Sequence, residues 1–210
     1  MEKVDNKDFL WYSLYAFAGF GLEILLLMIE NNFIKDQTIF TNCLHWTLTI
    51  VLWGAISLIL YKKSKSKLKF DIINNNKIQS KNIAFAIVLL IAYLIIKYFV
   101  IGGMKTINEF NELGIVKFIF QYAYYFFEVV LIMLTISFGQ RFFEGISKSK
   151  VVPFGGIVLA CTWGLMHILT QNFATGIFAF VSAIIYGIVY LQLNKNSKYS
   201  YFIILLMFIL

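Results

Sequence analysis

Charged residues are scarce in this sequence. Asp, Glu, Lys and Arg together make up 14% of its 210 residues, whereas 60% are apolar. A water-soluble domain of this length cannot bury so large an apolar fraction, because its surface requires many more charged side chains. The composition therefore excludes a soluble protein and indicates a polytopic membrane protein. Any chemistry has to use side chains inside the bilayer or at its edge.

Arginine, proline and cysteine are scarce as well. Arg141 is the one arginine beside 17 lysines, and basic residues do not alternate with aromatic ones, which excludes nucleic acid as a partner. The single proline, Pro153, precedes an apolar run, and a proline is tolerated where a helix begins. Cys43 and Cys161 lie within apolar runs, so we expect free thiols that pack as small apolar side chains.

Apolar runs of about twenty residues predict six membrane-spanning helices followed by a short seventh helix. The sequence thus predicts an all-α transmembrane bundle that forms a single integral membrane domain over residues 1–210, with the lipid bilayer as its surroundings. The expected spans are residues 9–29, 39–61, 83–104, 116–138, 153–169 and 175–193, and the short helix is expected at residues 199–210.

The distribution of basic residues predicts the orientation in the membrane. Fourteen of them lie in the N-terminal segment and in the loops at 62–81, 141–150 and 195–198, and only three lie in the segments on the opposite side. Because Lys and Arg are retained on the cytoplasmic side, the N-terminus is expected to be cytoplasmic. The excess of Lys, Ile and Asn is typical of AT-rich genes, so we expect a multi-pass protein of a bacterial cytoplasmic membrane.

Five ionisable side chains fall within the expected spans, where each is costly unless it finds a polar partner. Lys97 is expected to snorkel to the outer interface, and Glu23 to pair with Lys97 or with a tyrosine hydroxyl. His45 lies beside a tryptophan near an interface. Glu128 and His167 cannot easily reach an interface, which makes them the candidate catalytic residues.

Further polar residues share helix faces with these side chains. Gln121, Tyr124 and Glu128 lie on one face of the fourth span, and Trp163 and His167 lie on one face of the fifth. We expect these faces to converge on one polar core. The candidate binding residues are Glu23, His45, Gln121, Tyr124 and Trp163.

A seam of small residues accompanies the polar face of the fifth span. Gly156, Ala160 and Gly164 recur every four residues. Small side chains at this spacing let two membrane helices approach closely. We therefore expect the fifth span to contact a neighbouring helix along this seam.

Glu128, followed 39 residues later by the histidine of Trp163-x-x-x-His167, resembles the CPBP family of bacterial Abi and CAAX-protease-like intramembrane proteins. The resemblance covers roughly residues 116–210 and implies a bundle of about eight helices. Residues 127–132 are similar to a Glu-Glu-x-x-x-Arg motif, and residues 187–191 are similar to the helix that precedes a final His-x-x-x-Asn-type motif. The resemblance implies that Glu128 activates a water as a general base, together with His167.

The chain departs from this family pattern at several positions. Phe127 replaces the first glutamate, Ile132 replaces the arginine, and residues 201–210 contain neither histidine nor asparagine. The sequence therefore predicts a catalytically degenerate, self-immunity-type pseudoprotease that binds a peptide or a membrane-protein partner. One alternative is an active intramembrane endopeptidase that uses Glu128 and His167. Another is a small proton- or cation-coupled transporter.

No cofactor is expected, because the sequence has no His-Glu-x-x-His spacing. Two glutamates and two histidines nevertheless supply donor types that a divalent metal such as zinc accepts. A metal site therefore stays open as an alternative at Glu23, His45, Glu128 and His167.

Overall fold

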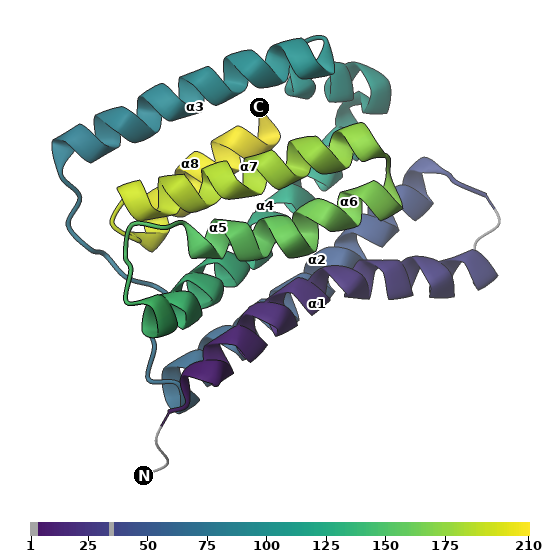
Figure 1. Cartoon of the computed structure of the whole chain (residues 1–210). Helices are drawn as coiled ribbons and strands as arrows, with labels where there is room; N and C mark the ends of the chain where they lie inside the picture. The colour runs from purple at the N-terminus through teal and green to yellow at the C-terminus, as the bar shows by residue number, and fades with distance from the viewer. Residues whose placement is uncertain (1–3, 34–35) are drawn as a thin grey trace.

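A computed structural model describes residues 4–33 and 36–210 (Figure 1). This part of the chain contains helices and no β-strand, which confirms the predicted all-α bundle. Helix α5, a π-helical turn (η1) and α6 run on as one continuous helix, Phe154–Thr170. The helices are α1 (Asn6–Phe33), α2 (Ile39–Lys67), α3 (Ser80–Ile101), α4 (Lys105–Ser147), α5 (Phe154–Leu159), η1 (Ala160–Gly164), α6 (Leu165–Thr170), α7 (Phe173–Gln192) and α8 (Ser197–Ile209).

Five of these helices, α1, α2, α3, α4 and α7, are long and apolar enough to cross a membrane. The fifth predicted span, Phe154–Thr170, is a shorter apolar helix. Its length of about 25 Å lies at the lower limit for crossing the hydrocarbon core. The six predicted spans are thus five full-length helices and one at this limit, and the short last helix is confirmed as α8, which has 13 residues.

The outward-facing surface of the bundle is apolar. On α3, the side chain of Val88 is 64% exposed and that of Phe99 is 77% exposed. A soluble protein does not expose contiguous apolar side chains over several long helices, whereas a bilayer solvates them. The protein is therefore an integral, multi-pass membrane protein.

Helix α4 is the central helix of the bundle, because it contributes to two apolar cores. Val129 and Ile136 pack into a core shared with α3, α7 and α8. Leu131 and Phe138 pack into a second core shared with α1 and α2. Side chains on α4 are therefore buried on both sides, and a polar side chain there has only protein neighbours to satisfy it.

Helix α4 begins earlier than the sequence predicts. It starts at Lys105 rather than near residue 116, but Gly114 interrupts it with φ 69° and ψ 167°, a conformation that glycine adopts readily. Residues 105–113 therefore form a short additional helix before the span. Helix α2 also extends beyond its apolar run and ends at Lys67 rather than at residue 61.

The four lysine-rich segments lie at one end of the bundle, as predicted (Figure 1, left). Asn6 donates a hydrogen bond to the carbonyl of Phe142 at 2.9 Å, which joins the start of α1 to the end of α4. Lys195, in the turn between α7 and α8, lies 2.6 Å from a carboxylate oxygen of Glu144. Asn76 of the loop before α3 donates to the carbonyl of Asn194 in the same turn.

The predicted small-residue seam is confirmed. A Cβ atom on Gly156 would lie 2.8 Å from the Cα atom of Gly187, and one on Gly164 would lie 2.8 Å from the Cα atom of Phe180. Both neighbours belong to α7, so the helix Phe154–Thr170 packs backbone to backbone against α7. This contact fixes the depth at which Trp163 and His167 are held.

Candidate functional site

A cavity of about 930 Å³ opens inside the bundle. Gln171 and Thr175 line it beside the turn between α6 and α7, and this turn lies at the end of the bundle opposite the lysine-rich segments (Figure 1). Its walls come from α1, α2, α3, α4, η1, α6, α7 and α8. Polar side chains also line it deep in the bundle, where the hydroxyl of Tyr93 lies 2.9 Å from that of Ser182. Six of the seven residues singled out from the sequence line this one cavity: Glu23, Gln121, Tyr124, Glu128, Trp163 and His167.

Glu128 and Trp163 are joined by a hydrogen bond on the cavity wall. The indole Nε1 of Trp163 donates to Oε1 of Glu128 at 3.1 Å. The two residues are only 7% and 6% exposed, so the carboxylate is held in a largely apolar setting. Because the indole engages Oε1, the second carboxylate oxygen is the one left for a molecule in the cavity.

His167 is held by the same tryptophan. Its Nδ1 lies 2.7 Å from the backbone carbonyl of Trp163, and the two rings meet edge to face with centroids 4.4 Å apart. A carbonyl oxygen only accepts hydrogen bonds, so Nδ1 must carry the proton. The neutral ring of His167 therefore offers an acceptor, Nε2, rather than a donor on the cavity wall.

The π-helical turn η1 positions both side chains. In this turn the N–H of Leu165 donates to the carbonyl of Ala160, five residues earlier, instead of four. Such a turn adds a residue to the helix and shifts the faces on either side of it, and it recurs at functional sites. Trp163 lies within η1 and His167 lies one turn beyond it.

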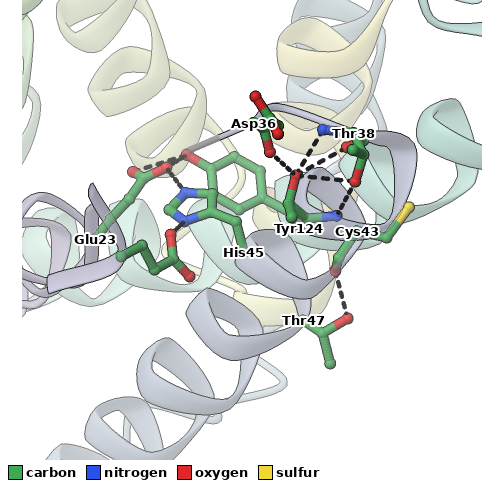
Figure 2. A network of polar contacts seen from close by, with 9 residues as sticks. Glu23, Asp36, Thr38, Cys43, His45, Thr47 and Tyr124 are labelled. Carbon is green, nitrogen blue, oxygen red and sulfur yellow. Dashed lines mark hydrogen bonds and ion pairs between the residues drawn. The ribbon is translucent and has the colours of Figure 1, made fainter. Parts of the chain in front are cut away.

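Glu23, Tyr124 and His45 form a second polar cluster beside the cavity (Figure 2). The hydroxyl of Tyr124 donates to the carboxylate of Glu23 at 3.0 Å, which matches one of the two predicted partners of Glu23. His45 contacts Glu23 through Nε2 at 3.4 Å and Glu30 through Nδ1 at 2.7 Å. His45 therefore joins the site through Glu23 rather than by lining the cavity.

The two carboxylates around His45 join α2 to α1. Both ring nitrogens of His45 face carboxylate oxygens, Nε2 that of Glu23 and Nδ1 that of Glu30.

A capping box sets the position of His45 along α2. The side chain of Thr38 accepts a hydrogen bond from the N–H of Thr41, and the side chain of Thr41 accepts one from the N–H of Thr38 (Figure 2). This reciprocal pair fixes the first turn of α2. His45 follows two turns after Thr38 and thus faces α1.

Sequence reasoning missed Lys105 and Glu109 because they lie in the unpredicted helix at 105–113, whereas Tyr125 shares the polar face of the fourth span with Gln121 and Glu128. The hydroxyl of Tyr125 donates to Oε1 of Glu109 at 2.8 Å, and Gln121 donates to both residues. Lys105 lies 3.9 Å from Glu109 and 4.2 Å from the centroid of the Tyr125 ring. The Lys105-x-x-x-Glu109 spacing, typical of a helix-stabilising ion pair, is the signal in the sequence that marks this segment as helical.

Lys97 also lines the cavity, and its position differs from the expectation. It is 4% exposed and does not reach an interface. Its Nζ donates to the carbonyls of Met207 and Phe208 at 2.9 Å each. Carbonyls in the last turn of a helix lack partners within that helix. Lys97 therefore donates hydrogen bonds to carbonyls in the last turn of α8.

The polar side chains of the cavity include both hydrogen-bond acceptors and donors, which suits a polar ligand. Three carboxylates, Glu23, Glu109 and Glu128, face it together with the amino groups of Lys97 and Lys105. Within residues 4–33 and 36–210, no three His, Cys, Asp or Glu side chains are placed to hold a metal ion. Cys43 and Cys161 are free thiols, as expected.

A comparison with protein-family models, curated proteins and solved structures finds no match to this chain. The resemblance to the CPBP family therefore rests on the motif residues alone.

Proposed function

We propose that this protein is a divergent, catalytically degenerate relative of the CPBP proteins that binds a peptide, or a segment of a membrane-protein partner, in its cavity. One observation carries the proposal. Glu128 and His167, the residues on which the resemblance depends, both contact Trp163 and line the same cavity.

The protonation of His167 favours binding over peptide cleavage. Cleavage needs hydrogen-bond donors aimed at the oxyanion that develops on the peptide carbonyl. The Nδ1 proton of His167 is engaged by a backbone carbonyl, so the neutral ring presents an acceptor instead. Ile132, where the family pattern has arginine, is fully buried in the apolar core. Residues 201–210 contain neither the histidine nor the asparagine of the family pattern, and the side chain that α8 contributes to the cavity is the apolar ring of Phe208.

The size and lining of the cavity suit a short extended segment. Its volume of about 930 Å³ lies near the upper end of the range for small-ligand sites, about 300–1,000 Å³. A peptide backbone offers alternating donors and acceptors, and the walls provide both, from the carboxylates and from Lys97 and Lys105. Aromatic side chains such as Trp53 and Phe178 supply apolar contact between them.

Filling the cavity is the test of this proposal. A photocrosslinking amino acid at Thr175, on the cavity wall, is expected to form a defined adduct with the partner in cells, identified by mass spectrometry. Met166→Trp places a large side chain in the cavity and is expected to lower the adduct yield at least tenfold. Glu128→Gln keeps the size and hydrogen-bonding capacity of residue 128 and is expected to stay within twofold.

Leu165→Trp is the matched control. Leu165 precedes Met166 on the same helix, is 40% exposed and does not line the cavity. Its adduct yield is expected to equal that of the parent protein. An equal loss in the Leu165 and Met166 variants would show that the adduct forms on the outer helix surface, and the cavity would then not be the binding site.

The second candidate function is an intramembrane endopeptidase. It is favoured by the second carboxylate oxygen of Glu128 and Nε2 of His167, two hydrogen-bond acceptors whose residues line the same cavity. In this case a membrane peptide is cleaved by the purified protein, and Glu128→Gln lowers the rate by about 10²-fold or more, because the general base is lost. Cleavage that persists unchanged in the Glu128→Gln variant would rule out this function.

A further inference from the structure

A second cavity lies between α1 and α2, at the lysine-rich end of the bundle. Its volume is about 1110 Å³. Side chains from the two helices and from the two residues after α2 line it. None of the seven site residues derived from the sequence lines it, so this second cavity is not explained by the proposed function.

The residues of α2 that line this cavity form one stripe, which changes from apolar to basic along the helix. Ile56, Ile59 and Leu60 line the deeper part, and Lys63 and Lys67 continue the same helix face toward the end. The spacing of three, four and seven residues places all five on one side of the helix. The stripe is thus apolar within the span and basic beyond it.

Helix α1 presents the facing stripe. Leu22, Gly19 and Tyr15 line the deeper part, followed by Tyr12 and by Asp8 near the lysine-rich end. From residue 8 to residue 22 an α-helix rises about 21 Å. The groove between the two stripes is therefore long and apolar, with polar groups gathered at one end.

The charges at that end favour an anionic group. Lys63 and Lys67 are joined there by Lys69, and among residues 4–33 and 36–210 the acidic side chain in the lining is Asp8. Lys65, on a different helix face, is engaged elsewhere, because its Nζ lies 2.9 Å from Asp71. This contact lowers the pKa of Asp71.

We propose that the groove between α1 and α2 is a binding site for an anionic phospholipid of the leaflet that faces the lysine-rich end. The phosphate lies among Lys63, Lys67 and Lys69, and one acyl chain lies along Gly19, Leu22, Ile56 and Ile59. Basic pockets between membrane helices on the cytoplasmic side are suited to such headgroups. A groove of about 20 Å matches the depth of one leaflet, since the bilayer with its headgroup regions is about 40–45 Å thick.

Native mass spectrometry of the full-length protein, purified in detergent and incubated with defined lipids, tests this site. Phosphatidylglycerol is expected to remain bound as a single adduct, and phosphatidylcholine at the same concentration is expected to bind at least tenfold more weakly. Glycerol 3-phosphate is not expected to displace the lipid. Displacement by it, or equal binding of the two lipids, would overturn the proposal.

Two variants locate the site. The triple change Lys63→Gln, Lys67→Gln and Lys69→Gln is expected to weaken phosphatidylglycerol binding at least tenfold. Ile59→Trp narrows the apolar part without altering charge and is expected to weaken both lipids. Ile59 is 47% exposed, so a larger side chain there does not disturb the core.

The matched control removes the same charge from the same region. Lys62, Lys77 and Lys81 are exposed and do not line the groove. Their triple change to glutamine is expected to leave phosphatidylglycerol binding within twofold of the parent. An equal loss in both triple variants would show general attraction to a basic surface, and would overturn the site. Lipid-free thermal unfolding of each variant shows whether it is folded.

Discussion

Gly156→Ala is expected to lower the free energy of unfolding by about 3 kcal/mol, at the upper end of the usual cost of overpacking a core. The added Cβ would lie 2.7 Å from the carbonyl oxygen of Ala183 and 2.8 Å from the Cα atom of Gly187. Both are backbone atoms of α7, so no side-chain rotation relieves the contact and the two helices must separate. Thermal or SDS-induced unfolding in detergent micelles measures the loss.

Gly21→Ala is the control for this substitution. Gly21 is also helical, but no heavy atom lies within 4 Å of the position that its Cβ would occupy. Alanine is the better helix former by about 1 kcal/mol, so this variant is expected to be as stable as the parent or slightly more stable. If Gly156→Ala unfolds at the same temperature as Gly21→Ala, the close packing of the two helices is not a major source of stability.

Lys97→Met is expected to cost about 2–3 kcal/mol, because hydrogen bonds from a charged group contribute about 1.5–3 kcal/mol and their loss leaves the buried carbonyl of Met207 without this donor. The carbonyl of Phe208 keeps a second donor in Lys105 at 3.2 Å, whereas that of Met207 loses the contact described above. Methionine has nearly the same length, so the effect reports the hydrogen bonds rather than a void. Chemical unfolding and proteolysis near α8 measure it.

Lys81→Met is the matched variant on the same helix. Lys81 lies in the first turn of α3, is exposed, and changes the net charge by the same amount. We expect its unfolding temperature to stay within about 2 °C of the parent, as for surface substitutions generally, which alter stability by about 0.5 kcal/mol or less. Equal stability of the two variants would mean that Lys97 does not hold α8 in place.

The helices of this protein are largely predictable from sequence because lipid imposes a simple rule. Every backbone polar group within the hydrocarbon must be satisfied inside its own segment, so apolar runs become helices. The bounds differ where the helix leaves the hydrocarbon. The polar segment Lys62–Lys67 continues α2 beyond its apolar run, and hydropathy does not register a helix in water.

The short helix at residues 105–113 shows what hydropathy misses. Its polar residues, Lys105 and Glu109, lie between two apolar runs, where hydropathy predicts a loop. In the folded chain Lys105 lies over the rings of Tyr125 and Phe208, which are outside this segment. Only a three-dimensional arrangement brings this segment back onto the cavity.

The candidate site was predictable in membership but not in pairing. Glu128, Trp163 and His167 share the cavity because helix periodicity places polar residues on the inner faces. The pairing of Glu128 with the Trp163 indole depends on the π-helical turn, and nothing in the composition of Ala160–Gly164 signals that turn. Glu30, the second carboxylate at His45, lies just past the first predicted span. An ionisable residue is common there and does not indicate a site.

The double burial of α4 constrains how the protein is assembled during synthesis. When α4 enters the membrane, α1 and α2 are already available to cover one of its sides, but the helices that cover the other side have not yet been made. The indole that donates to Glu128 follows it by 35 residues. During this interval the carboxyl group of Glu128 lacks the indole, so it has to accept hydrogen bonds from water or from the insertion machinery, or carry a proton itself. Nascent chains halted between residues 128 and 163 should therefore be the least securely inserted intermediates.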